Sequence, residues 1–285
     1  MLTYEKDPRC WLAQLSDLKA DPMPERVREH QVAIRAIVDW EWSFLTQPHP
    51  ELGRAGPVCP FARPALTRGT IFYTVRPGAD LDVDAVESVA RSYRGWFLEL
   101  EPVSGREAQY KSINMIFPDL PPSALGPVIE GVQERLKLLY AREGIMIGEF
   151  HPGPPDKGGL WNERFRPLRS PLPLLGIRHM VPTDLAFLKG DRESMAAYLA
   201  VCGDRVPDSL AEEVRATALR FGLSWPGRAE SSDAGGRGEA EEQAVEAAAA
   251  GCPHDATRAQ TPGAGCPAHA DSGGGVGERV PVAAS

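Results

Sequence analysis

The segment of residues 148–188 gathers most of the side chains in this sequence that could bind a metal, a haem iron or an anion. It contains His151, His179, four arginines and a run of prolines. An imidazole can act as a metal ligand or a general base, and guanidinium groups bind carboxylates through paired hydrogen bonds. We therefore expect a functional site in this segment.

His151 follows an apolar segment directly and precedes Pro152-Gly153-Pro154. This order places its imidazole at the end of a predicted strand, where loop residues can build a pocket around it. The position suits an axial ligand to haem iron, a metal ligand or a general base. The alternative is a structural histidine that hydrogen-bonds to the loop and caps the strand.

His179 lies within another predicted strand, where successive side chains point to opposite faces of the sheet. If Arg178 and Met180 face one way, His179 faces the other. A core histidine bonded to the backbone is the favoured interpretation of His179. A non-haem metal site formed with His151 is the alternative.

Arg164, Arg166 and Arg169 lie between prolines that restrict the backbone and favour extended geometry. A preorganised loop with several guanidinium groups could clamp carboxylates, either those of a substrate or the propionates of a haem. A solvated basic loop that pairs with an acidic surface is the other interpretation.

Cys59 lies in a Gly-Pro-Val-Cys-Pro-Phe segment, at a loop end or on a short helix that starts at Pro60. A thiol near a helix start has a lowered pKa and could serve as a ligand or nucleophile. A small buried hydrophobic residue is the more common role of such a cysteine.

Four further metal-binding side chains lie near the C-terminal end of the chain. They could supply two sulfurs and two imidazoles to a zinc ion, or make weaker metal or haem contacts. They are Cys252, His254, Cys266 and His269.

The elements that must position these residues follow from hydrophobic periodicity and from breaks at Gly and Pro. Helices are predicted at residues 24–45, 82–98, 123–142, 183–188, 193–201 and 209–221. Strands are predicted at residues 69–75, 113–117, 145–150 and 174–181, with a long loop at 152–173. The pattern predicts one α+β domain over residues 1–223, with a mixed sheet of four or slightly more strands and helices covering one face. Residues 224–285 are predicted to form a disordered tail, because this stretch is rich in Gly, Ala and Glu and has few large apolar residues.

Composition excludes several classes of protein. The formal net charge of −8 and the absence of a long Lys/Arg run argue against a nucleic-acid partner. No window reaches the length of an apolar membrane span, and the first residues lack a signal peptide pattern, so we expect a cytoplasmic protein. The five cysteines show no compact spacing, which favours reduced thiols.

Four motifs together resemble an uncharacterised bacterial family, a domain of unknown function. They are HPELGRAGPVCPF at 49–61, GEFHP at 148–152, FRPLRSPLP at 165–173 and IRHMV at 177–181. The resemblance covers about residues 30–190.

The order of these motifs also resembles, more distantly, the YqcI/YcgG family, which includes haem-dependent N-oxygenases that act on amino or guanidino groups. Where that family has an Arg-Asp pair, this sequence has Arg178-His179. The resemblance implies haem binding. The positions that it carries over are Cys59, His151, Asn162, Phe165, Leu168, Arg169, Ile177 and Arg178.

Two functional hypotheses follow. In the first, an oxygenase-like enzyme binds haem through His151, with Cys59 as the rival axial ligand and Arg166 and Arg169 at the propionates. Its substrate is a small metabolite with an amino or guanidino group, and it is contacted by Arg178, Asn162 and Phe165. In the second, a non-catalytic accessory protein of a biosynthetic cluster binds a small anionic molecule through the same arginines. The sequence leaves open which one holds, and it leaves the oligomeric state open.

Overall fold

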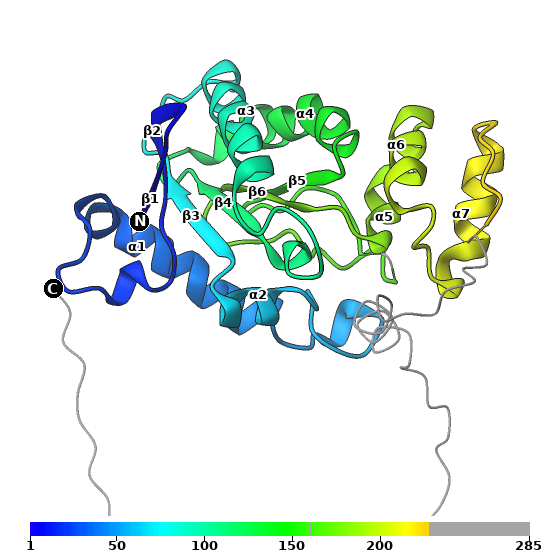
Figure 1. Cartoon of the computed structure of the whole chain (residues 1–285), viewed down its shortest axis with the longest axis horizontal. Coiled ribbons are helices and arrows are strands. Elements are labelled where there is room, and N and C mark those ends of the chain that lie inside the picture. The colour runs from blue at the N-terminus through cyan, green and yellow to red at the C-terminus, as the bar shows by residue number, and fades with distance from the viewer. Residues whose placement is uncertain (160, 228–285) are drawn as a thin grey trace, which may run out of the picture. The chain divides into compact units, whose positions relative to one another are not determined.

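The computed structural model describes residues 1–159 and 161–227. Within these residues the fold is α+β, with seven α-helices and a mixed four-stranded sheet, as predicted (Figure 1). The predicted ligands Cys252, His254, Cys266 and His269 lie outside the described residues. No helix in the described ranges has both the length and the apolar character needed to cross a membrane.

Most of the predicted helices are present with small shifts at their ends. The α-helices are α1 (Glu25–Trp40), α2 (Ala62–Arg68), α3 (Val83–Glu99), α4 (Gly131–Ala141), α5 (Leu185–Leu188), α6 (Arg192–Cys202) and α7 (Asp208–Arg220). Helix α2 was predicted only as one alternative for the segment after Cys59.

Four of the six strands form the central sheet. The strands are β1 (Leu2–Tyr4), β2 (Asp7–Leu12), β3 (Ile71–Val75), β4 (Ser112–Ile116), β5 (Ile145–Phe150) and β6 (Leu174–His179). The sheet order is β3-β4-β6-β5, with β3 and β4 parallel and the other two pairings antiparallel. This confirms the predicted mixed sheet. Strand β5 forms one edge.

The hairpin of β1 and β2 was not predicted. Its strands are short, and no Gly or Pro marks the two-residue turn between them. The chain beyond β2 continues beside β3, where Ala13 and Tyr73 exchange two backbone hydrogen bonds of 2.8 and 2.9 Å.

The helix predicted at residues 123–142 is interrupted. Residues Leu125–Glu130 form a π-helical turn, and the regular α4 begins only at Gly131. Pro127 lacks the N–H that an α-helix needs, so a widened turn at this place is expected. A second π-helical turn, Glu41–Leu45, follows α1 directly.

Helices cover both faces of the sheet, and the prediction of one covered face was wrong. Figure 1 shows α3 and α4 on one side of the sheet and α1 and α2 on the other. On the first side, Phe97 and Leu136 pack with Ile113 of β4. On the second side, Ile37 packs with Tyr73 of β3. Strands with side chains on two covered faces read as continuous apolar runs, so periodicity could not distinguish one covered face from two.

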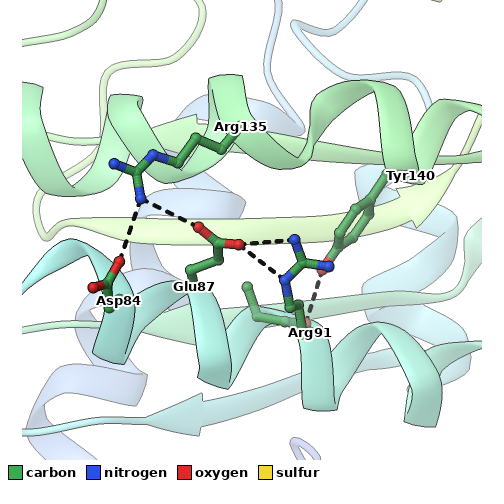
Figure 2. Close-up of polar contacts among 6 residues, drawn as sticks. Asp84, Glu87, Arg91, Arg135 and Tyr140 are labelled. Atoms are coloured by element: carbon green, nitrogen blue, oxygen red, sulfur yellow. Dashed lines mark hydrogen bonds and ion pairs between the residues drawn. The ribbon is translucent and has the colours of Figure 1, made fainter.

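A network of charged side chains joins α3 to α4 (Figure 2). Arg135 of α4 lies 3.4 Å from carboxylate oxygens of both Asp84 and Glu87, and Glu87 also pairs with Arg91. Beside Arg91, the buried Tyr140 hydroxyl donates to the Ala90 carbonyl at 2.8 Å. Because surface ion pairs add little stability, the buried Tyr140 contact and the apolar core hold the two helices together.

Lys111 is a buried cation that caps the C-terminal end of α3. Its Nζ donates to the carbonyl oxygens of Phe97 at 2.7 Å and Leu100 at 2.6 Å, and it lies 4.3 Å from the Phe97 ring centroid. Burial lowers the pKa of Lys111 to about 8. The negative end of the helix favours the ammonium group and offsets part of its desolvation.

Replacing Lys111 with Met should lower the free energy of unfolding by about 1–3 kcal/mol, because the two carbonyls lose their donor and stay buried. Urea denaturation measures this difference. The exposed Lys19 offers a matched control, since Lys19→Met removes the same group from the surface. Equal stabilities of the two variants would contradict the capping role.

Candidate functional site

A cavity of about 440 Å³ lies mostly against the face of the sheet that carries α1 and α2, and at the β5 edge it also reaches Gln133 and Lys137 of α4. One row of paired residues across the sheet, beside the cavity, contains two glycines and therefore few side-chain atoms. In this row Asn114 pairs with Gly176, which pairs with Gly148 on the edge strand. Cavities of 300–1,000 Å³ are typical of small-molecule sites.

The two glycines make room for an aromatic ring. A Cβ atom at Gly148 would lie 3.2 Å from the Phe150 ring, and one at Gly176 would lie 3.4 Å from the same ring and 3.2 Å from the Asn114 side-chain oxygen. The ring of Phe150 therefore lies across both glycines. It contacts Trp40 edge-on, with ring centroids 5.7 Å apart. These aromatic rings and Asn114 form one continuous wall.

Glu41 brings a buried carboxyl group to this wall. It is the first residue of the π-helical turn after α1 and is 2 % exposed. Its side chain accepts hydrogen bonds from the Tyr73 hydroxyl at 2.5 Å and from the Asn114 amide at 2.7 Å. Burial raises the pKa of Glu41 to about 8, against the opposing effect of these two hydrogen bonds. Within residues 1–159 and 161–227, no Lys, Arg or His forms an ion pair with Glu41.

Arg178 lies one row further along the same face, paired across the sheet with Ser112 and Met146. Its guanidinium donates to both carboxylate oxygens of Asp184 at 2.7 and 2.5 Å. Burial lowers the pKa of Arg178, but the Asp184 carboxylate outweighs this effect and raises it. The side chain keeps 34 % of its surface accessible and lines the cavity.

Cys59 and Arg54 line the cavity near Arg178. Burial raises the pKa of the Cys59 thiol, while the charges of Arg178 and Arg54 and the backbone N–H groups of Phe61 and Ala62 oppose that rise. Arg54 donates only to neutral acceptors, the carbonyls of its own loop at positions 55 and 58, and its Nε is buried without an acceptor among the described residues. This corner of the cavity, formed by Arg54, Cys59 and Arg178, is called the arginine corner below.

A third polar group lies at the β5 edge. The buried Glu149 forms an ion pair with Lys157, whose Nζ also donates to Gln133 at 3.0 Å. Burial raises the pKa of Glu149, and Lys157 opposes that rise. This carboxyl has a cation partner, unlike that of Glu41.

His151, the predicted haem ligand, is buried, but its side chain is not among those that line the cavity. Its Nε2 lies 3.2 Å from a Glu130 carboxylate oxygen, and its Nδ1 is buried without a hydrogen bond in the part of the chain described. Burial lowers the pKa of His151, while Glu130 opposes this. Ligation of haem iron by His151 stays a prediction.

The structure separates His179 from His151. Ile145 pairs with His179 while Phe150 pairs with Leu174, so the two histidines lie at opposite ends of the β5–β6 pair, roughly 20 Å apart. His179 packs against a ring of α3, and its pKa is lowered to about 4 by burial first and by the charges of Lys111 and Arg205. In the described ranges, no three His, Cys, Asp or Glu side chains are arranged to hold a metal.

The predicted arginine clamp is not brought to the cavity. Arg166 pairs with Asp156 and donates to a loop carbonyl, and Arg169 is exposed. Asn162 donates to the Glu51 carbonyl at 2.7 Å and so ties two loops together.

Five of the positions singled out in the sequence do line the cavity, namely Cys59, Phe165, Leu168, Ile177 and Arg178. Glu41, Asn114 and Arg54 also line the cavity and were not predicted as site residues. The first two could have been recognised, because each is a single polar residue inside an apolar or aromatic run, Trp-Glu-Trp and Ile-Asn-Met-Ile.

The raised pKa of Glu41 links stability to pH. Its pKa is about 8 in the folded chain and near the ordinary 4.5 in the unfolded chain, so between these values the folded chain binds more protons. Stability contributed by this group is therefore lost as the pH rises from about 4.5 to 8, by a few kcal/mol in total. Glu41→Gln should flatten this decline, measured by urea unfolding at pH 5, 6.5 and 8. A decline of the same slope in both proteins would show that Glu41 does not cause it.

Comparison with known proteins gives one match. No curated protein and no solved structure matches the chain. These comparisons give no link to the YqcI/YcgG family. A family model does match over residues 34–213, which include the sheet, the cavity wall and the arginine corner. The chain therefore belongs to the family described as Domain of unknown function (DUF6875).

Proposed function

We propose that this protein binds a small amphipathic molecule in the cavity and that Glu41 holds a cationic nitrogen of that molecule. The observation that carries the proposal is the buried Glu41 carboxyl, which lies in the cavity wall without an ion-pair partner in the described chain. A ligand with an ammonium or guanidinium group would supply that partner.

The buried Glu41 carboxyl destabilises the fold. Burial of a carboxyl without a cation is unfavourable, and the group responds by keeping its proton at neutral pH. A structural role in joining α1 to β3 and β4 could be filled by a neutral Gln at lower cost. A carboxyl that gains a cation on ligand binding recovers the lost interaction.

The surroundings of Glu41 also suit a cation. Asn114 uses its N–H₂ group on Glu41, which leaves its side-chain oxygen as a second acceptor in the wall. Trp40 and Phe150 present aromatic surface beside these acceptors. Aromatic faces attract ammonium and guanidinium groups, and they also bind the apolar part of a ligand.

Binding of hexylamine, compared with hexanol, tests the proposal. Only the ionised Glu41 attracts the ammonium group, so the dissociation constant of hexylamine should fall about tenfold per pH unit between pH 5 and 7 and level off above pH 8. Hexylamine itself stays protonated over this range, as lysine does. Calorimetry in buffers of different ionisation enthalpy should detect up to about one proton released per amine bound at pH 7, and none for hexanol.

Two variants control this experiment. Glu41→Gln should weaken hexylamine binding at pH 8 at least tenfold and abolish its pH dependence. Ala186 lines the cavity on α5, so Ala186→Trp should fill it and block both ligands, whereas Ala216→Trp on the exposed side of α7 should not. Binding of hexylamine that is equal in wild type and Glu41→Gln would contradict the proposal.

A haem-dependent oxygenase is the second candidate, and one observation favours it. Cys59 lines the cavity, with backbone N–H groups and two guanidinium groups close to its sulfur. Cys59 would hold the iron, and Arg54 and Arg178 would pair with propionates; haem so held supplies oxygen activation. This arrangement uses Cys59, the rival ligand of the sequence analysis, in place of His151.

An absorption spectrum after expression with haem supply separates the two candidates. A Soret band that is lost in Cys59→Ser would support Cys59 as the ligand, and a band lost in His151→Ala would support His151. A colourless protein would contradict both haem arrangements and leave the binding of a cationic molecule as the remaining candidate.

A further inference from the structure

The arginine corner holds a positive charge without a partner. Arg178 is neutralised by Asp184 through two hydrogen bonds. Arg54 has no carboxylate partner within the described ranges. Its two hydrogen-bond acceptors are backbone carbonyls, and its guanidinium lies 4.8 Å from the centroid of the Trp161 ring. Burial lowers the pKa of Arg54, which shows that the charge is held partly out of water.

Glu41 and Arg54 are therefore two lining groups without a partner of opposite charge among the described residues, while a further cation of the lining, Lys111, uses its ammonium group on the two carbonyls at the end of α3. The other close pairs, Glu149 with Lys157 and Arg178 with Asp184, are complete. A ligand with a single charge would satisfy only one of the two unpaired groups.

We infer that the ligand is a zwitterion, an ω-amino or ω-guanidino carboxylate whose carboxylate binds at the arginine corner. This inference rests on the proposed function. Its nitrogen group lies at Glu41 and Asn114, and its apolar spacer lies along the aromatic wall. Arg54 supplies the charge for the carboxylate, and the free N–H groups of Arg178 supply additional donors.

The length of the spacer follows from the strand. Asn114 is paired with Gly176, and Arg178 is two residues further along β6, a distance of about 6.5 Å between backbone positions. On the opposite wall, the Cys59 N–H donates to the Leu45 carbonyl at 2.8 Å, at the end of the π-helical turn that begins at Glu41. An extended spacer of about five carbon atoms matches the separation along the strand, because a zigzag chain advances less than its C–C bond length of about 1.5 Å per bond.

The test uses a series of probes on the full chain at pH 8. The zwitterions are 4-aminobutyrate, 6-aminohexanoate and 8-aminooctanoate, and the single-charge controls are hexylamine and hexanoate. Affinity should be highest for 6-aminohexanoate, at least tenfold above hexylamine and hexanoate and at least threefold above the shorter and longer zwitterions. Calorimetry or NMR titration measures these differences.

Variants assign the carboxylate to Arg54. Arg54→Gln should bring 6-aminohexanoate down to the affinity of hexylamine and leave hexylamine itself unchanged. Arg54→Lys keeps the charge and should restore most of the difference, which a merely structural role of Arg54 would not explain. Arg28 is exposed on α1 and outside the cavity wall, so Arg28→Gln controls for the overall loss of a positive charge.

The outcomes separate this inference from the proposed function. If hexylamine binds in a Glu41-dependent way but 6-aminohexanoate binds no better, the zwitterion is excluded and the cationic site stands. The same conclusion follows if Arg54→Gln leaves the difference intact. If none of the probes binds, or if Glu41→Gln has no effect on any of them, both proposals fail.

Discussion

The carboxyl group of Glu41 is the constraint on which the cavity depends. Its two hydrogen bonds join the end of α1 to β3 through Tyr73 and to β4 through Asn114. The π-helical turn that starts at Glu41 widens the helix at the point where this side chain enters the sheet. Such turns are frequent at functional sites, because they shift a side chain without ending the helix. Glu41 therefore has two effects. Burial of its carboxyl lowers the stability of the fold, and its hydrogen bonds fix the position of the cavity wall.

The two faces of the sheet explain why the cavity lies mostly on one side. The face toward α3 and α4 carries large apolar side chains such as Ile113, Ile147 and Ile177, which form a core with the two helices. On the other face, the row of Asn114, Gly176 and Gly148 contains two residues without a side chain. Helix α1 packs against β3, and over the two glycines lies the single ring of Phe150. The cavity forms where the sheet lacks side chains at Gly176 and Gly148 and where loop residues line the opposite side. Binding sites commonly form beside loops.

The sequence predicted the elements better than the site. Alternating and helical periodicity located all four strands of the sheet and most helices, because each element buries a regular apolar stripe. It could not locate the π-helical turns, which differ from an α-helix only in backbone geometry. It favoured His151 and the arginines of residues 164–169 because they are chemically capable residues close together in sequence. In the structure, however, His151 turns toward Glu130 and Arg166 toward Asp156, since each has a carboxylate within reach.

The cavity residues came instead from segments far apart in the chain, and a single sequence does not show that they meet. What could have been noticed is a mismatch of polarity: Glu41 between two tryptophans and Asn114 inside an apolar strand both contradict the pattern of their own element. Residues that break a local rule are expected where function requires it.

Pairing of charge is a sharper criterion for function than the density of reactive residues. Around this cavity, Glu149 with Lys157 and Arg178 with Asp184 are closed ion pairs, and each of them stabilises the wall that contains it. A closed pair gains little from a ligand, because new hydrogen bonds must compete with those already made. Glu41 and Arg54 face the same space with neutral partners only, so each can gain a full ionic interaction when a ligand enters. The free energy available for binding is therefore concentrated at these two groups, and the aromatic surface between them adds affinity for the apolar part of the ligand.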